Sequence, residues 1–149
     1  MKASKRGLDF IKQEEEAGKP ALKAYKDIAG IWTIGYGHAY VDKDMVITAE
    51  EAEAIFEADV AKKSAWIDKL VTVPLTQGQY DALASFVFNL GEGALRSSRL
   101  LKNLNNGHYQ HAADEFVKWC KYKKNGVLTL SPGLLGRRKR EVKLWNTPD

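Results

Sequence analysis

The sequence lacks the features that stabilise small exported proteins or carry a chain through a membrane. Cys120 is the only cysteine among 149 residues, so no disulfide can form within the chain and the fold needs no oxidising compartment. The N-terminus has no apolar run of the roughly 7–15 residues found in a signal peptide, and no segment approaches the roughly 20 apolar residues of a membrane span. We therefore expect accumulation in the cytoplasm, no stable membrane insertion, and release that depends on a separate protein.

Low-complexity tracts and internal repeats are also lacking, and this excludes disordered and solenoid proteins. Hydrophobic residues make up 44% and charged residues 28% of the chain, close to the globular average. At this length we expect one domain over 1–149, with lobes of about 12–60 and 61–149 plus an N-terminal helix. The net charge of +4 favours an anionic partner: nucleic acid, a membrane surface or a cell-wall polymer.

The hydrophobic pattern predicts an α+β fold with a small N-terminal antiparallel sheet, a larger helical lobe and a cleft between them. Helical spacing begins at Leu8 and ends before Gly18, whereas β-branched and aromatic residues between Leu22 and Val46 indicate the sheet. Gly35 and Gly37 predict a bulge or a close approach of a ligand to the backbone. Capping and apolar spacing predict five more helices: Thr48 to about Leu70, Thr76 to Gly91, Ser98 to Asn106, Tyr109 to Cys120, and Ser131 to Trp145.

Acidic residues at the first helix end and at the first sheet turn are the candidates for chemistry. Three consecutive glutamates, Glu14 to Glu16, precede Asp27 in the turn Asp27-Ile28-Ala29-Gly30. Two carboxylates in different environments suit glycoside hydrolysis, because one donates a proton to the leaving oxygen while the other remains ionised. From spacing alone, solvated surface glutamates and an ordinary turn aspartate are the favoured interpretation, because turns favour aspartate for backbone reasons.

Three blocks of the sequence resemble phage-type lysozymes, glycoside hydrolase family 24. They are LKAYKDIAGIWTIGYGH, then SFVFNLGEGALRSSRLLKNLNNG, and finally AADEFVKW followed by LSPGLLGRRKRE. The resemblance spans nearly the whole chain. It implies a monomeric endolysin that cuts the β-1,4 bond between N-acetylmuramic acid and N-acetylglucosamine in peptidoglycan glycan strands. It implies no cofactor, and release through a holin-like protein that is a functional rather than a bound partner.

The family's catalytic residues are a glutamate, an aspartate and a threonine, and the last two correspond to Asp27 and Thr33, six residues apart. The glutamate normally lies nine residues before the aspartate, but Gly18 occupies that position. Alignment of the first helix, in which the glutamate follows an apolar residue by four, points to Glu15 with a lengthened loop after it. Glu16 is the rival and Glu14 the third choice. The resemblance implies that Glu15 is the general acid and that Asp27 and Thr33 activate water in an inverting enzyme.

Four further residues lie in blocks that resemble the family's substrate cleft: Phe88, Asn89, Ser98 and Arg138. Each has a structural alternative. A phenylalanine at a helix end is commonly core, and a serine before a helix commonly caps it. We expect His38 to anchor the sheet. His108 and His111 lack the other ligands of a metal site, and we expect no metal.

The run Arg137 to Arg140, RRKR, supports a second class of function. A basic helix with Trp145 nearby is compatible with nucleic-acid binding, although no recognition motif accompanies it and we expect no nucleic-acid partner. A solvated helix face is the structural alternative, and attraction to anionic wall polymers is a further one. A third function class is a wall-binding module that has lost catalysis through the shifted glutamate.

Overall fold

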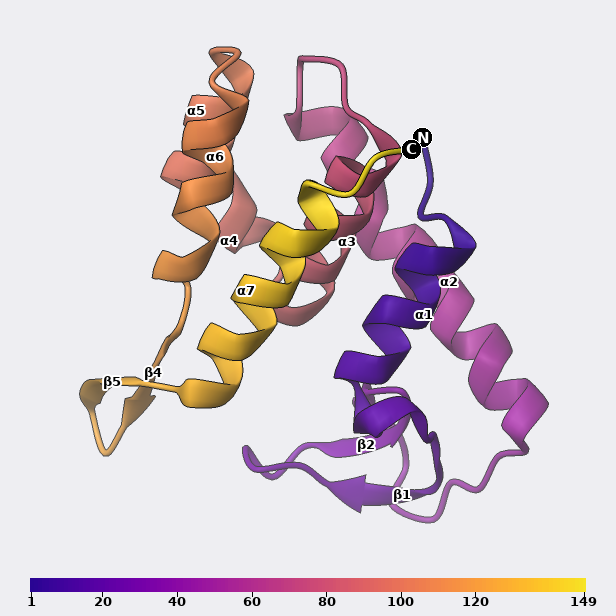
Figure 1. Ribbon diagram of the computed structural model, residues 1–149. Helices are drawn as coiled ribbons and strands as arrows, with labels where there is room; N and C mark the ends of the chain where they lie inside the picture. Colours follow the sequence, from indigo (N-terminus) through magenta and orange to yellow (C-terminus); the bar gives the residue numbers. More distant parts are fainter.

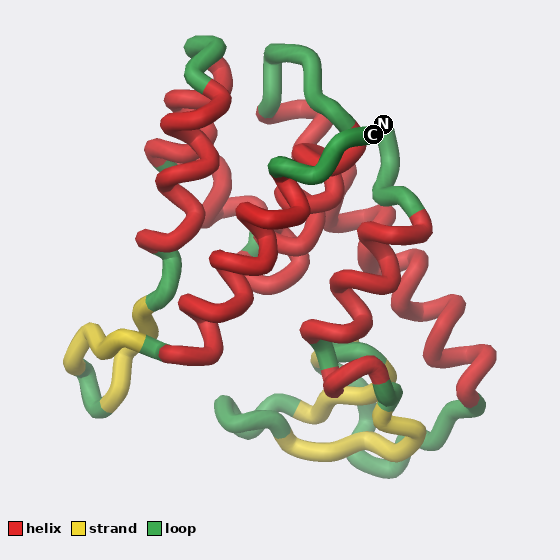
Figure 2. The backbone as a smooth tube through the Cα atoms, viewed as in Figure 1, coloured by secondary structure: helices red, strands yellow, loops and turns green.

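The computed structural model describes residues 1–149 and confirms the α+β architecture. A small sheet occupies one end of the molecule, and helices form most of the rest, together with a separate β-hairpin (Figures 1 and 2). The N-terminal part contains α1 (Lys5–Glu14), η1 (Glu16–Gly18), β1 (Ala21–Lys26), β2 (Trp32–Gly35) and β3 (His38–Ala39). The remainder contains α2 (Ala49–Leu70), α3 (Gln77–Leu90), α4 (Glu92–Ser97), α5 (Arg99–Asn105), α6 (Tyr109–Glu115), η2 (Phe116–Lys118), β4 (Lys121–Lys124), β5 (Val127–Leu130) and α7 (Pro132–Trp145).

The first sheet is antiparallel in the order β1-β2-β3, and its irregular pairing puts the predicted bulge into β1. Tyr25 pairs with Thr33, but the next aligned pair is Ala21 with Gly35, so four residues of β1 span two of β2. Gly35 adopts a φ of +66°, a left-handed conformation that favours glycine.

Both predicted capping boxes are present, and they fix the starts of the two central helices. Thr48 caps α2 and Thr76 caps α3, because each hydroxyl accepts a hydrogen bond from a backbone N–H three residues later. In return, the side chains of Glu51 and Gln79 accept a hydrogen bond from the backbone N–H of the cap residue. At 22 residues α2 links the sheet to the helical lobe. None of the helices combines the length and the apolarity that a membrane crossing needs.

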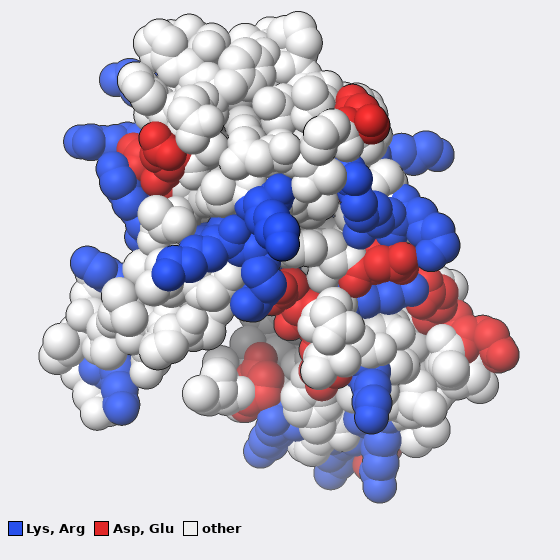
Figure 3. Space-filling view, in the orientation of Figure 1, with Lys and Arg blue, Asp and Glu red and all other residues white.

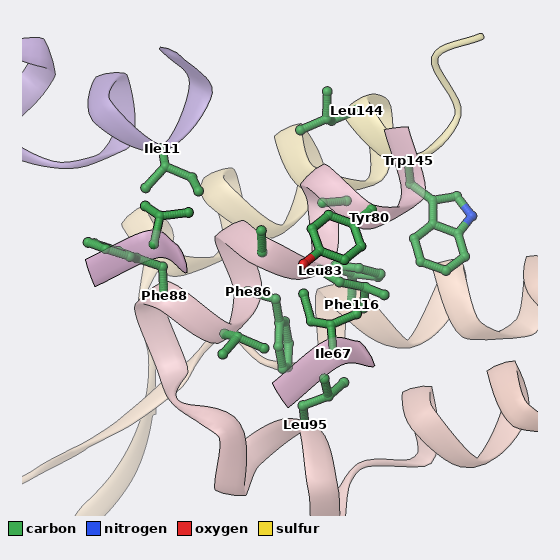
Figure 4. Packing of buried hydrophobic residues seen from close by; sticks show 14 of the residues in the cluster. Ile11, Ile67, Tyr80, Leu83, Phe86, Phe88, Leu95, Phe116, Leu144 and Trp145 are labelled. Atoms are coloured by element: carbon green, nitrogen blue, oxygen red, sulfur yellow. The ribbon is translucent and has the colours of Figure 1, made fainter. Parts of the chain in front are cut away.

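Helix α3 is the centre of the core, because ten of its residues are buried, including the run Tyr80 to Phe88. Aromatic rings from later elements pack around it (Figure 4). The ring centroid of Phe86 lies 5.6 Å from that of Phe116, and the centroid of Phe116 lies 5.5 Å from that of Trp145. Helix α7 packs closely along α3. A Cβ atom on Gly78 would lie 2.6 Å from the Leu144 carbonyl oxygen, so glycine is needed there. This close contact fixes the position of the arginines of α7.

The segment from Gly91 to Leu130 differs most from prediction. The helix predicted from Ser98 to Asn106 is present as α5, with Ser98 as its cap, but the short helix α4 before it was not predicted. The helix expected to reach Cys120 ends earlier, and a hairpin follows. Its turn residues Asn125 and Gly126 have positive φ values of 52° and 79°. An Asn-Gly pair is the strongest short-range hairpin signal, so the sequence alone could have predicted this hairpin.

Candidate active site

A recess separates the sheet from the helical lobe at the level where α1 ends. In the space-filling view it lies between the sheet and the β4–β5 hairpin, below a group of Lys and Arg side chains (Figure 3). Acidic side chains line it in the same view. The end of α1, the β1–β2 turn and the start of α7 are therefore the elements from which a site is built here.

Glu15 is the first residue after α1 and its C-cap. Its backbone N–H donates to the Ile11 carbonyl oxygen at 2.9 Å, and Ile11 is fully buried, so the backbone of Glu15 is fixed against the core. The side chain is 22% exposed. Gly37 lies beside it, since a Cβ there would be 3.7 Å from Glu15 Oε1. A glycine leaves open space next to the carboxyl group.

The surroundings of Glu15 favour its protonated form. Burial raises the pKa of the Glu15 carboxyl above its ordinary value, although Arg137 and Lys63 act in the opposite direction. Arg137 Nη1 lies 3.2 Å from Glu15 Oε2. Desolvation exceeds the attraction to these cations, and this is the condition in which a carboxylic acid keeps its proton for donation.

The two neighbouring glutamates are engaged elsewhere. Arg140 donates to both carboxylate oxygens of Glu14, at 2.8 Å to Oε1. Burial raises the pKa of Glu14, but Arg140 and the charges of Arg137 and Arg138 outweigh that effect, so its pKa is lowered. Glu16 is exposed and accepts a hydrogen bond from the Tyr25 hydroxyl. Glu14 is even less exposed than Glu15, at 9% against 22%, but its charge is neutralised by Arg140. Glu16 is exposed, so of the three glutamates only Glu15 combines burial with a raised pKa.

Asp27 lies in the turn that joins β1 to β2 and is held by its own loop. Its Oδ1 accepts hydrogen bonds from the backbone N–H groups of Ala29 and Ile31, both at 2.9 Å. These bonds fix the carboxylate in an Asx-type turn. Since both fall on Oδ1, Oδ2 remains available to a ligand or a water molecule.

Thr33 lies on β2 and is 4% exposed. Its hydroxyl donates to the Ile31 carbonyl at 3.0 Å, which leaves the oxygen free to accept. Tyr25 pairs with Thr33 across the sheet. Burial raises the pKa of the Tyr25 phenol, and the negative charges of Glu16, Asp27 and Glu15 raise it further. Tyr25 is thus in hydrogen-bond contact with Glu16 and within the electrostatic reach of Asp27 and Glu15.

A pocket of about 370 Å³ continues from Gly37 along β3 and α2. Its lining includes Tyr40, which is 84% exposed, together with Trp66, Lys62 and Lys63. A pocket of this size falls within the range of small-ligand sites. Gly37 lines it and also lies beside Glu15, so the pocket opens next to that carboxyl group.

Only half of the RRKR run is a solvated face, because Lys139 and Arg140 are exposed. The side chains of Arg137 and Arg138 are 5% and 0% exposed, so the structural alternative of a solvated helix face was wrong for these two residues. Arg138 Nε lies 2.6 Å from Oε1 of Glu141, a fully buried carboxylate. The prediction that Arg138 contacts substrate was therefore also wrong, because the whole side chain is enclosed by protein. No sequence signal indicated the role of Glu141.

The other three predicted cleft residues lie in the helical lobe with structural contacts. Phe88 is 7% exposed and packs 5.7 Å from the Phe56 ring in the core. Asn89 is half-buried, and its Oδ1 accepts from Arg138 at 2.8 Å. Ser98 caps α5 and is 6% exposed, but it also lines a second pocket, of about 480 Å³, with Trp119.

His38 joins β3 to α2, because its Nδ1 lies 2.7 Å from Asp59 Oδ2. This contact fits the anchoring role expected from the sequence. No group of three or more His, Cys, Asp or Glu side chains comes together in a way that could hold a metal ion.

Comparison with known proteins assigns the chain to a family. The phage lysozyme family model matches residues 15–141. An endolysin of Acyrthosiphon pisum secondary endosymbiont phage 1 is 47% identical over 99% of both chains. The muramidase domain of SpmX from Asticaccaulis excentricus has a TM-score of 0.90 and 35% identity over 99% of both chains. An endolysin from Escherichia coli O157:H7 phage FAHEc1 has a TM-score of 0.89 and 39% identity over 98% of this chain and 94% of its own. The chain therefore belongs to the phage lysozyme family and is a hydrolase of the endolysin type.

Proposed function

We propose that this protein hydrolyses the β-1,4 bond between N-acetylmuramic acid and N-acetylglucosamine in peptidoglycan, and that this causes lysis of the host cell. The observation that carries the proposal is the Glu15 carboxyl group. It is largely enclosed, lies beside Gly37 at the opening of a pocket, and has a raised pKa because of burial. Family membership supports the same reaction class.

In the proposed reaction Glu15 is the general acid. Its proton passes to the O4 oxygen of N-acetylglucosamine as the bond from that oxygen to C1 of N-acetylmuramic acid breaks. A water molecule attacks C1 from the opposite face, and its proton passes to Asp27. The products are two free sugar ends with inverted configuration at C1. After the reaction Glu15 regains its proton from solvent.

Asp27 and Thr33 are the proposed pair that holds the attacking water. Asp27 Oδ2 lacks the backbone hydrogen bonds that occupy Oδ1, and the Thr33 hydroxyl donates to the Ile31 carbonyl. An oxygen whose proton is already directed to a carbonyl presents its lone pairs to water. Water bound by both residues would be held and deprotonated at one place.

The glycan strand is the proposed ligand of the pocket next to Gly37. Tyr40 and Trp66 offer aromatic surface there, while Lys62 and Lys63 offer donors. Asn89 and Ser98 remain predicted substrate contacts, and each keeps a structural role besides. For Phe88 the packing in the core favours the structural alternative.

We further propose that the chain acts as a monomeric single domain, accumulates in the host cytoplasm and reaches the wall after release through a holin-like protein. The core supports the single-domain proposal. One cluster of 25 buried residues runs from Ile34 and Tyr36 of the sheet region to Leu144 and Trp145 of α7. The predicted lobes thus share one hydrophobic core.

The test is hydrolysis of purified peptidoglycan by the wild type and by Glu14→Gln, Glu15→Gln and Glu16→Gln. Loss of a general acid lowers the rate by about 10²-fold or more, so we expect that loss for Glu15→Gln alone. Mass spectrometry after borohydride reduction identifies the new reducing end, and proton NMR identifies the anomer formed first. Circular dichroism of each variant checks the fold.

The same experiment distinguishes the other function classes. Binding to the wall without cleavage by the wild type would indicate a wall-binding module. An active Glu15→Gln together with an inactive Glu16→Gln would move the general acid to the next residue. Nucleic-acid binding is not favoured, because half of the basic run is enclosed in ion pairs.

A further inference from the structure

A buried arginine connects the end of α1 to a second carboxylate that lies behind the site. Arg137 directs its three guanidinium nitrogens to three groups. Nη1 lies 3.2 Å from Glu15 Oε2, Nη2 donates to the Ser85 carbonyl and hydroxyl oxygens at 3.3 Å, and Nε lies 3.5 Å from Glu141 Oε2. Arg137 is therefore shared between a carboxyl group at the cleft and one inside the protein.

Glu141 is an unusual residue to find at this depth. Its side chain has no exposed surface, and an ionised group at such a position loses its hydration at a cost of several kcal/mol unless it is well paired. Arg138 pairs with it at 2.6 Å, and the Ser85 hydroxyl donates to it at 2.5 Å. Burial raises the pKa of Glu141, while Arg138 and Arg137 oppose that rise. The net effect is a raised pKa, but two guanidinium groups and a hydroxyl donor converge on its oxygens, which is the arrangement of an ion pair.

Arg138 would already neutralise Glu141 without Arg137. The additional contact therefore affects Arg137 more than Glu141. It is an electrostatic attraction at 3.5 Å on the Nε edge, without a hydrogen bond, while Nη1 faces Glu15. It also divides the attraction of one cation between two carboxyl groups. A cation that faced Glu15 alone would favour the ionised form more strongly.

We propose that Glu141 is a positioning residue for catalysis, which orients Arg137 and offsets its charge so that Glu15 keeps its proton. This inference rests on the proposed function, because it needs Glu15 to be the general acid. Other charged or titratable groups near Glu15 are Lys63 of α2, Glu16 of η1, and Tyr25 and Asp27 of the sheet region. Glu14 and Arg140 form their own pair beside the network. None of these contacts Glu141 in the way that Arg137 does.

The experiment is the pH dependence of kcat and KM for soluble peptidoglycan fragments, measured for the wild type, Glu141→Gln and Arg137→Met. A general acid gives an alkaline limb, above which the rate falls tenfold per pH unit. Without the charge of Glu141, the positive charge of Arg137 acts on Glu15 alone and lowers the pKa of Glu15. The alkaline limb should therefore move to lower pH by about 0.5–1 unit. Above the limb that shift is a three- to tenfold loss of kcat, with KM changed by less than about twofold.

Two comparisons separate positioning from structural damage. In the Arg137→Met background Glu141→Gln should cause no further shift, because the connecting cation is gone. Asp81→Asn is the matched control, since Asp81 is a fully buried carboxylate of α3 that is held by Ser4 and Gln77. It should lower the thermal midpoint and leave the limb in place.

A limb that stays within about 0.2 unit in Glu141→Gln, or that moves equally in the Arg137→Met background, would overturn the inference. If Glu141→Gln does not fold, Glu141→Asp replaces it. The aspartate keeps the charge near Arg138 but withdraws it from Arg137, so a smaller shift in the same direction is expected, and no shift would contradict the proposal. An inactive wild type or an active Glu15→Gln would instead refute the proposed function, and the two failures are thus distinct.

Discussion

The two acids that face the cleft are held in opposite ways. Asp27 takes its orientation from Ala29 and Ile31, which lie two and four residues further along the chain. Glu15 faces Arg137, which is 122 residues away, and that arginine in turn contacts Ser85 and Glu141. A short turn can position a base by itself. The general acid depends on the packing of α7 against α3.

The largest effect is expected from changing the charge of the locally held acid. In Asp27→Asn the amide oxygen still accepts from Ala29 and Ile31, so the turn should persist, but the group can no longer take a proton. The rate on peptidoglycan should fall about 10²- to 10⁴-fold, with the thermal midpoint almost unchanged. Activity within tenfold of the wild type would show that Asp27 is only a turn residue.

A smaller effect is expected at Glu15, the acid that is held by contacts distant in the sequence. Arg137→Met removes a cation that lowers the pKa of Glu15, so that pKa should rise further. The alkaline limb should then move to higher pH by about one unit. The loss of the contacts to Ser85 and Glu141 should lower the free energy of unfolding by about 1–3 kcal/mol. Thermal unfolding and a pH–rate profile measure both effects.

An alkaline limb that keeps its position or moves to lower pH in Arg137→Met would contradict the proposed arrangement around Glu15. Lys139→Met is a suitable control, because Lys139 is an exposed cation of the same helix. It should leave both the limb and the thermal midpoint close to those of the wild type.

The smallest effect concerns the turn backbone beside Asp27. Gly30 has a φ of +79° and open space where a side chain would project, so Gly30→Ala should cost about 1 kcal/mol through strain alone. The rate should fall less than about threefold, because the Asp27 carboxylate is held by the N–H groups of Ala29 and Ile31, whereas the Gly30 N–H binds only the Asp27 carbonyl. Gly93→Ala, inside α4 and also in open space, should be neutral or slightly stabilising.

The contrast between the two acids also explains what could be predicted from the sequence. The capping residues Thr48 and Thr76, the turn at Asp27 and the bulge opposite Gly35 are local features, and local patterns predicted them. Ser98 was correctly interpreted as a cap in its structural alternative, but the α4 helix before it was missed. The Asn125-Gly126 turn was overlooked although its signal is local.

The missed part of the site has a physical reason. The sequence led us to interpret Arg138 as a substrate contact and the RRKR run as accessible charge, and it gave no indication for Glu141, because charged residues are rarely buried. Their burial depends on Ser85 and Asn89 of α3 and on the end of α1, which only the folded chain brings together. Spacing within α7 cannot indicate which of its faces lies against another helix that supplies such partners.

The central claim is that Glu15 is the proton donor, and the most direct test is to titrate its carboxyl carbon by ¹³C NMR and compare the result with the pH–rate profile of the wild type. Burial of Glu15 predicts a pKa above the ordinary value of a glutamate. It also predicts that this pKa coincides with the alkaline limb of kcat/KM. A Glu15 titration at or below the ordinary value, or a limb that follows a different group, would contradict the account.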